Sequence, residues 1–236
     1  QKLLVIDDLA DRRHQCDALL DQTLGRDPVD YRSCVPASCV ILCGAQYALL
    51  RPEFAAWRSY SLQQRHLAPP RNILISMGGV DKDNVTGMIL AKLASANLPA
   101  DWHITVVMGS TAPWLETVQQ QAARMSVTTR VLSNVSEMAR LMSNSDLAIG
   151  AAGATSWERC CLGLPTMMMV LAENQRAIAQ ALLKAGAVYL VDLTTLNEHR
   201  LITNPHDEIH AFYAMSATAA SVTDGLGITK VMDFLN

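Results

Sequence analysis

The sequence predicts an α/β fold with one complete Rossmann-like lobe, preceded by only the last part of a first lobe of the same kind. From residue 72 onward, short β-rich apolar runs alternate with longer helical patterns, which is typical of βαβ units in a parallel sheet. Residues 1–50 carry only two clear strand patterns, at residues 3–7 and 40–43. Two strands cannot form a stable open sheet alone, so they indicate the end of a larger lobe.

The segment between the two regions favours a linker. Residues 51–71 are polar and charged, and they end in Pro69 and Pro70, which stop regular structure. We therefore expect residues 1–56 to form the C-terminal part of an incomplete first lobe, residues 57–71 the linker, and residues 72–236 the second lobe.

Strand and helix patterns alternate through the second lobe. We expect strands at residues 72–77, 104–108, 129–132, 147–149, 166–171 and 188–191. Helix patterns cover residues 84–96, 113–125, 136–142, 155–162 and 174–185, and two more follow at residues 205–220 and 229–235. Gly186 is placed to end the helix before it. Strands connected in this way make a complete Rossmann-like domain.

Composition narrows the class of protein. The chain has 236 residues, half of them hydrophobic, so it can bury a large core. The net charge of -3 and the lack of a local basic patch predict no nucleic-acid partner. The longest apolar run, residues 166–172, is far below the ~20 residues that cross a bilayer, and no signal-peptide pattern opens the chain. We expect a cytoplasmic protein without membrane contact. The composition does not indicate whether the chain forms oligomers.

Metal and cofactor motifs are missing from the sequence. The six cysteines are unevenly spaced in apolar segments and form no CxxC pair, which indicates reduced, buried thiols. His206 and His210 have the spacing of HExxH, but the glutamate is one position late, and solvated histidines are the simpler interpretation. Neither GxGxxG nor GxxxxGK[ST] occurs, which disfavours dinucleotide cofactors and P-loop ATP hydrolysis. We expect no metal and no cofactor.

Residues directly after the strands are the candidates for ligand binding, because ligands of open parallel sheets lie beyond the carboxyl ends. Gly78 and Gly79 follow the first strand of the second lobe, where glycines let the backbone approach an anion, although a plain turn also favours glycine. In residues 150–158, Gly153 and the Ser156 hydroxyl suit a phosphate at a helix start. Glu158 could accept hydrogen bonds from ribose hydroxyls, although acidic residues also simply favour helix N-termini.

Three further positions carry weaker signals. Asn174 and Gln175 follow the fifth strand of the second lobe, and their amides could bind sugar hydroxyl or acetamido groups. Val135 lies in a turn that could face a flat base. His14 is the histidine closest to the first-lobe strand ends and is a candidate for acid–base chemistry, with an ordinary loop histidine as the alternative.

Several stretches together resemble one known family. They are Asp7-Asp8-Leu9-Ala10-Asp11-Arg12, residues 47–54, residues 76–81, residues 150–163 and Glu173-Asn174-Gln175. The set is similar to the UDP-2,4-diacetamido-2,4,6-trideoxy-β-L-altropyranose hydrolases of pseudaminic acid biosynthesis. Taken together, these stretches are far more specific than any one of them.

The resemblance implies a GT-B fold in which the C-terminal lobe holds the UDP of a UDP-sugar. Water then cleaves the bond between the anomeric carbon and the UDP oxygen, with inversion, and releases UDP and the free sugar. No metal is required. Matching positions imply contacts to UDP and contacts to the sugar or diphosphate; the first set is Gly78, Gly79, Val135, Gly153, Ser156 and Glu158, and the second is Arg51, Asn174 and Gln175.

One departure from the family bears on catalysis. The family's proposed general base is a histidine in a GxGH-like loop of the first lobe, and no such loop occurs in residues 1–236. Because the family carries roughly a hundred residues before the DDLAD-like segment, we expect this chain to be N-terminally truncated and inactive alone. Two alternatives stay open: a GT-B glycosyltransferase with an acceptor sugar, and a non-catalytic UDP-sugar-binding module.

Overall fold

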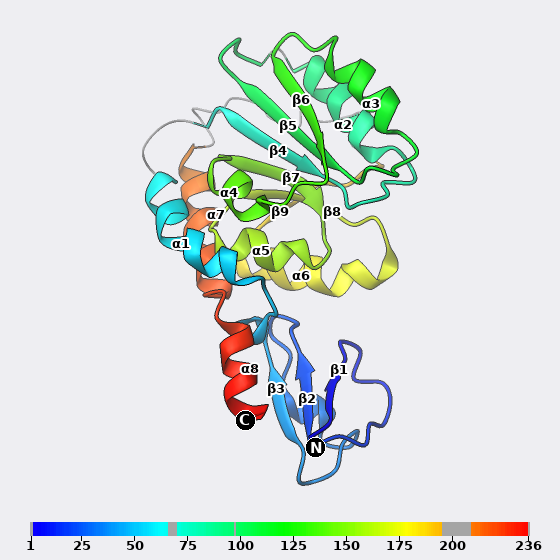
Figure 1. Ribbon diagram of the computed structural model, residues 1–236, viewed down its shortest axis with the longest axis vertical. Coiled ribbons are helices and arrows are strands. Elements are labelled where there is room, and N and C mark those ends of the chain that lie inside the picture. Colours follow the sequence, from blue (N-terminus) through cyan, green and yellow to red (C-terminus); the bar gives the residue numbers. More distant parts are fainter. Residues whose placement is uncertain (1, 66–69, 97, 195–208, 236) are drawn as a thin grey trace.

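The larger of two α/β lobes is built on a six-stranded parallel sheet (Figure 1). The computed structural model describes residues 2–65, 70–96, 98–194 and 209–235. The sheet has the order β6-β5-β4-β7-β8-β9, which is the strand order of a Rossmann fold and agrees with the predicted Rossmann-like domain. Its strands are β4 (Asn72–Ser76), β5 (His103–Met108), β6 (Thr128–Ser133), β7 (Leu147–Ala151), β8 (Thr166–Met169) and β9 (Tyr189–Leu190).

Two hydrophobic cores cover the faces of this sheet, because successive strand residues point to opposite sides. Ile73 and Ile75 of β4 pack into one core with α2 and α3, whereas Leu74 packs into the other with α4, α5 and α6. The predicted end of α6 at Gly186 is confirmed, with φ of 76°. The helices are α2 (Val85–Ala94), α3 (Leu115–Ala122), α4 (Met138–Ser143), α5 (Thr155–Cys161), α6 (Arg176–Ala185) and α7 (Ile209–Val222).

The smaller lobe contains three parallel strands, one more than the sequence predicted. They are β1 (Leu4–Ile6), β2 (Ala18–Asp21) and β3 (Val40–Cys43), in the order β1-β2-β3, with 3-10 turns at Pro28–Tyr31 and Ala45–Tyr47. The prediction missed β2. This central strand is short and buried on both faces, so it shows no alternation of apolar and polar residues, and its alanine and leucines favour helices.

Residues 57–64 of the expected linker are helical. Helix α1 (Pro52–Gln64) lies on the second lobe beside α4 and α5, with Phe54 fully buried. Its polar residues are the reason that the sequence suggested a linker. Arg58 donates to the carbonyl oxygen of Ala220 at 2.7 Å, and the Ser61 hydroxyl donates to that of Leu162 at 2.7 Å. Polar side chains that bond the neighbouring backbone thus make α1 part of the larger lobe.

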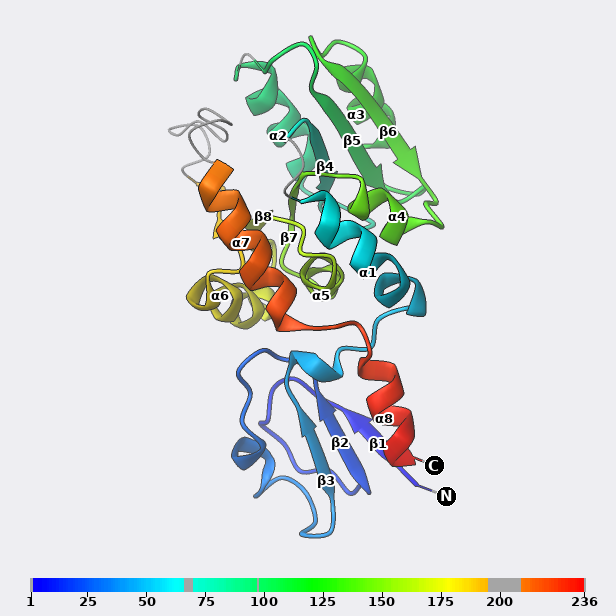
Figure 2. The ribbon, with the colours of Figure 1, turned by 90° about the vertical axis from the view of Figure 1, so that its left-hand side faces the viewer.

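The end of the chain returns to the smaller lobe, which also differs from the expected division at residues 72–236. Helix α8 (Gly227–Leu235) lies beside the three-stranded sheet (Figure 2). Its Val231 packs with Leu20 and Leu42, and the Lys230 ammonium donates to the carbonyl oxygen of Gln46 at 3.2 Å. The amphipathic pattern of α8 predicted a helix but could not identify its partner.

Two expectations fall partly outside the described residues. The predicted helix at 205–220 appears as α7 from Ile209, and its expected start, together with His206, lies outside them. Among the residues that are described, no helix is both long and apolar enough to span a bilayer. Over the same ranges, no group of three or more His, Cys, Asp or Glu side chains could hold a metal ion.

Candidate functional site

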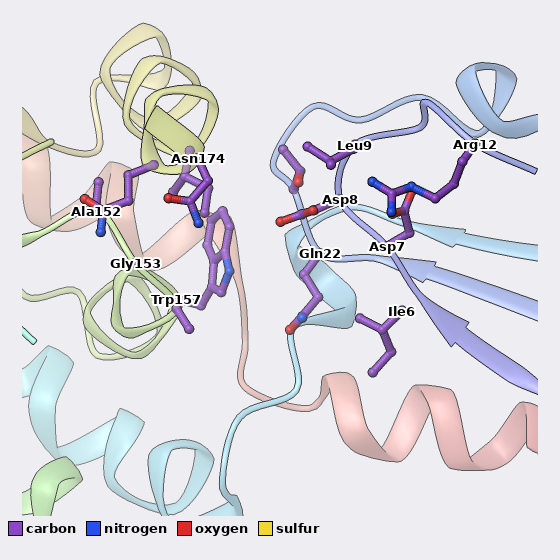
Figure 3. A pocket seen from close by; sticks show the side chains of 14 residues that line it. Ile6, Asp7, Asp8, Leu9, Arg12, Gln22, Ala152, Gly153, Trp157 and Asn174 are labelled. Carbon is purple, nitrogen blue, oxygen red and sulfur yellow. The ribbon is translucent and has the colours of Figure 1, made fainter. Parts of the chain in front are cut away.

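A cleft of about 480 Å³ lies between the lobes, beyond the carboxyl ends of strands from both sheets (Figure 3). One wall belongs to the smaller lobe and the other to the larger lobe. The smaller lobe contributes Ile6, Asp7, Asp8, Leu9, Arg12, Gln22 and Thr23, and the larger lobe contributes Ala152, Gly153, Ala154, Trp157, Asn174, Gln175 and Ile178. Of the predicted site residues, Gly153, Asn174 and Gln175 therefore meet in one cavity.

The smaller-lobe wall carries two carboxylates, Asp7 and Asp8, and one cation, Arg12, which pairs with Asp11 at 2.8 Å. The Asp7 carboxylate accepts hydrogen bonds from the Ala10 N–H at 3.0 Å and from the Tyr31 hydroxyl at 3.1 Å. Burial alone would raise the pKa of Asp7, but these hydrogen bonds and the nearby His14 outweigh burial and hold the pKa below its ordinary value. Asp7 is therefore ionised at neutral pH, beside the exposed carboxylate of Asp8. Such a wall favours hydrogen-bond donors over a phosphate.

The larger-lobe wall offers backbone donors and carboxamides. Among the described residues, the N–H groups of Gly153, Ala154 and Thr155 have no backbone acceptor. Asn174 is exposed to the cleft, whereas the side-chain oxygen of Gln175 accepts from the Leu171 N–H at 2.9 Å. Gln175 thus also holds the end of β8 in place. This wall can bind groups that accept hydrogen bonds.

Gly78 and Gly79 follow β4, next to the β7 loop but outside the residues that line the cleft. Ser76 pairs with Gly150 across β4 and β7, so the two glycine-bearing loops leave one sheet edge side by side. Gly78 has φ of 90°, a backbone conformation that favours glycine. A Cβ added to either glycine would meet no described atom within 4 Å, so both face open space. The loops could therefore approach the same ligand.

A further group of predicted residues gathers beside α1, α4 and α5. Arg51 donates to the carbonyl oxygen of Ser136 at 3.5 Å and pairs with Glu53 at 2.9 Å. Val135, next to Ser136, is partly buried against the core of this face. Burial raises the pKa of Glu158, against the attraction of Arg51. Arg51, Val135 and Glu158 are therefore neighbours, although none of them lines the cleft.

Ser156 is enclosed. Its side chain is 1% exposed, and its hydroxyl oxygen accepts a hydrogen bond from Arg159 Nη2 at 3.2 Å. A direct bond from this hydroxyl to a phosphate stays a prediction. His14 is mostly buried as well, with Nε2 3.7 Å from the Asp7 carboxylate, and it does not line the cleft.

Sequence reasoning missed part of the cleft. Gln22 and Thr23 follow β2, so the rule that ligands lie beyond strand ends would have found them if β2 had been recognised. Asp7 and Asp8 were noticed only within a family resemblance, although they follow β1 directly. Trp157 carried no signal, because its ring is both part of the core and part of the cleft wall.

We expect Glu158→Gln to stabilise the unliganded protein at neutral pH. The folded-state pKa of Glu158 lies above its unfolded value, so its contribution to stability is greatest below the unfolded pKa and is lost as pH rises through the folded pKa. A neutral amide avoids this loss. Urea unfolding of both proteins across pH checks the result: the variant gains stability near neutrality and converges with the wild type in acid. Equal stability at every pH would contradict it.

A family match adds to this geometry. The model of the glycosyltransferase family 28 C-terminal domain matches residues 72–224, well over half of the chain. The chain belongs to this family. The matched segment contains the complete Rossmann-like sheet and both glycine-bearing loops.

Curated relatives of the chain include proteins of sugar biosynthesis. The spore coat polysaccharide biosynthesis protein SpsG of Bacillus subtilis (strain 168) is 28% identical over 197 residues, which cover 81% of this chain and 57% of the relative. The UDP-2,4-diacetamido-2,4,6-trideoxy-beta-L-altropyranose hydrolase of Campylobacter jejuni is 28% identical over 185 residues, 78% of this chain and 63% of that enzyme. The chain therefore spans less than two thirds of the length of either relative.

Solved structures support the GT-B fold. MurG of Acinetobacter baumannii superposes with a TM-score of 0.62 at 20% identity, over 93% of this chain and 60% of MurG. The lipopolysaccharide glycosyltransferase WaaG superposes with a TM-score of 0.55 at 18% identity, over 92% of this chain and 62% of WaaG. At these identities the likeness establishes the fold, and the predicted GT-B class is confirmed.

Proposed function

We propose that this chain holds a UDP-sugar in the interlobe cleft and belongs to a nucleotide-sugar hydrolase. The observation that carries the proposal is the contrast between the two walls. The larger lobe presents backbone N–H groups at Gly153 and Ala154 that have no acceptor in the described part of the chain, whereas the smaller lobe presents the carboxylates of Asp7 and Asp8. A ligand with a diphosphate at one end and hydroxyl or acetamido groups at the other matches both walls.

Different predicted residues suit different parts of such a ligand. Gly78, Gly79 and Gly153 suit the diphosphate through their backbone, with Ser156 in support. Glu158 suits the ribose hydroxyls and Val135 the uracil ring. The sugar or the diphosphate would then meet Asn174, Gln175 and Arg51.

The finer activity we propose is hydrolysis of UDP-2,4-diacetamido-2,4,6-trideoxy-β-L-altropyranose, in pseudaminic acid biosynthesis. Water attacks the anomeric carbon, the bond to the UDP oxygen breaks with inversion, and UDP leaves with the negative charge. Backbone donors beside the diphosphate would stabilise that charge as it develops. The Campylobacter jejuni relative, which carries the name of this hydrolase, supports the assignment.

A glycosyltransferase is the second candidate. The family description names glycosyl transfer, and a further relative at 27% identity over 143 residues is named as an N-acetylglucosamine transferase of Dichelobacter nodosus, covering 58% of this chain and 39% of that enzyme. A transferase would replace the attacking water by the hydroxyl group of an acceptor sugar. The cleft has the same two walls in both cases, and the two activities differ in the nucleophile that attacks the anomeric carbon.

Incubation of the protein with the UDP-sugar in H₂¹⁸O separates the candidates. Hydrolysis releases UDP without an acceptor and places ¹⁸O at the anomeric carbon of the free sugar. UDP release that requires an added acceptor would favour the transferase. Tight binding of UDP by calorimetry, with no release under either condition, would fit a binding module and equally a hydrolase whose general base is not among residues 1–236. The presence or absence of a GxGH-like loop in the encoding gene then separates these two. Absence of UDP binding would contradict the proposal as a whole.

A further inference from the structure

Arg159 lies buried behind both glycine-bearing loops. Its side chain is 2% exposed, and Nη2 donates to the carbonyl oxygen of Ala151 at 2.7 Å and to the Ser156 hydroxyl at 3.2 Å. Nη1 lies against Gly150, where an added Cβ would collide with the guanidinium group. The position of Gly150 at the end of β7 therefore makes room for this cation.

The charge of Arg159 has no ion-pair partner among the described residues, although the neighbouring Glu158 carboxylate attracts it from a greater distance. No carboxylate of the described residues forms an ion pair with it, and Nε is buried without a hydrogen-bond acceptor. Burial lowers the pKa of Arg159 to about 10, so the group is still protonated at neutral pH. A buried cation without a partner is strongly unfavourable, and native proteins normally pair such a charge.

Arg65 shows how this protein satisfies a buried arginine elsewhere. Burial also lowers the pKa of Arg65 to about 10. Its guanidinium group, however, donates to the carbonyl oxygens of Ser145, Leu162 and Met142 and to the Ser61 hydroxyl. Every nitrogen of Arg65 thus has an acceptor, whereas Nε of Arg159 has none among the described residues.

The location of Arg159 indicates what would balance the charge. Gly150 pairs with Ser76 across the sheet, so the guanidinium group lies under the point where β4 and β7 end. The loops that begin there contain Gly78 and Gly79 on one side and Gly153 on the other. An anion held by these loops would be the ion-pair partner that Arg159 lacks among the described residues.

We propose that Arg159 is a positioning residue for an anionic group: it anchors residues 150–156 through Ala151 and Ser156, and it supplies a buried positive charge behind a diphosphate bound by the glycine loops. The inference rests on the proposed function where it names the diphosphate of UDP. The inference that some anion binds here depends only on the observations at Arg159. Arg159 does not touch the reacting atoms, so it is not a catalytic residue.

The test compares Arg159→Met with Arg65→Met, a matched loss of a buried arginine away from the glycine loops. Binding of inorganic pyrophosphate, UDP and uridine is measured for each protein by calorimetry, together with the rise in melting temperature that each compound produces. We expect Arg159→Met to weaken the affinity for pyrophosphate and UDP roughly ten- to a hundredfold, with uridine affinity unchanged. Arg65→Met lowers the melting temperature but keeps the ratio of UDP to uridine affinity.

Each outcome is decisive. If the wild type binds UDP and Arg159→Met binds it equally well, the inference is overturned and the proposed function stands. If the wild type binds pyrophosphate as tightly as UDP and discriminates no base, the proposed function fails and the anion site stands. If it binds neither, both are overturned. Should Arg159→Met not fold, pyrophosphate is added to ¹⁵N-arginine-labelled wild type, and an unshifted Nε–H signal of Arg159, assigned with Arg159→Lys, overturns the inference.

Discussion

Replacing Gly153 by leucine should abolish UDP binding while leaving the fold intact. A Cβ at Gly153 would meet no described atom within 4 Å, and its φ is not in the left-handed region, so a larger side chain can be accommodated without strain. The residue lines the cleft directly, and the leucine side chain would occupy the space of the ligand. We expect the dissociation constant for UDP to rise at least a hundredfold, about 2.7 kcal/mol.

Calorimetry measures the affinity for UDP, and thermal unfolding shows whether the fold is intact. Gly153→Ala is the graded control, because one methyl group fills less of the cleft and should give an intermediate loss of affinity. Both variants should melt close to the wild type. Wild-type affinity in Gly153→Leu would show that UDP does not occupy the space beside Gly153.

The second large effect concerns the smaller lobe, where Asp21→Ala should destabilise the protein by about 3–5 kcal/mol. Asp21 is fully buried at the end of β2, and its carboxylate accepts from Arg26 Nε at 2.6 Å, from the Tyr31 hydroxyl at 2.8 Å and from the Thr23 N–H at 2.7 Å. Removal leaves a cation and two donors without this partner. Gln22 and Thr23, which line the cleft, come directly after Asp21 in the chain.

Asp30→Ala is the matched control, because Asp30 contacts the same arginine. Its carboxylate lies 3.6 Å from Arg26 Nη1 and its side chain is 43% exposed, so its loss should cost less than about 1 kcal/mol. Urea unfolding followed by circular dichroism gives both free energies. A loss in Asp21→Ala no larger than in Asp30→Ala would mean that the buried carboxylate does not hold the smaller lobe together.

Local patterns predicted the second lobe well. The alternation of short apolar runs with helical patterns corresponds to the strands and helices of the Rossmann-like lobe. A glycine at the expected position ends α6. Such signals depend on a few neighbouring residues, so they can be read without knowledge of the fold. The same reasoning missed β2, whose apolar residues are buried on both faces, and took the polar residues of α1 for a linker.

The candidate site was likewise predicted in part. Strand-end reasoning identified Gly153, Asn174 and Gln175, which the structure brings into one cleft. It also named Val135 and Glu158, and the family resemblance added Arg51; these three gather beside α1 instead. Asp7, Asp8, Gln22 and Thr23 complete the opposite wall, and their role depends on a lobe whose central strand the sequence did not reveal.

The sequence by itself determined the type and order of elements in the larger lobe, the glycine-bearing strand ends and the likeness to UDP-sugar enzymes, because each of these is a local feature of the chain. The tertiary structure alone decided that α8 returns to the smaller lobe, that two walls of opposite character face each other, and that Nε of Arg159 is buried with no acceptor in the described part of the chain. These features depend on which distant segments pack together. Long-range packing is set by the burial of many side chains at once, and no short stretch of sequence records it.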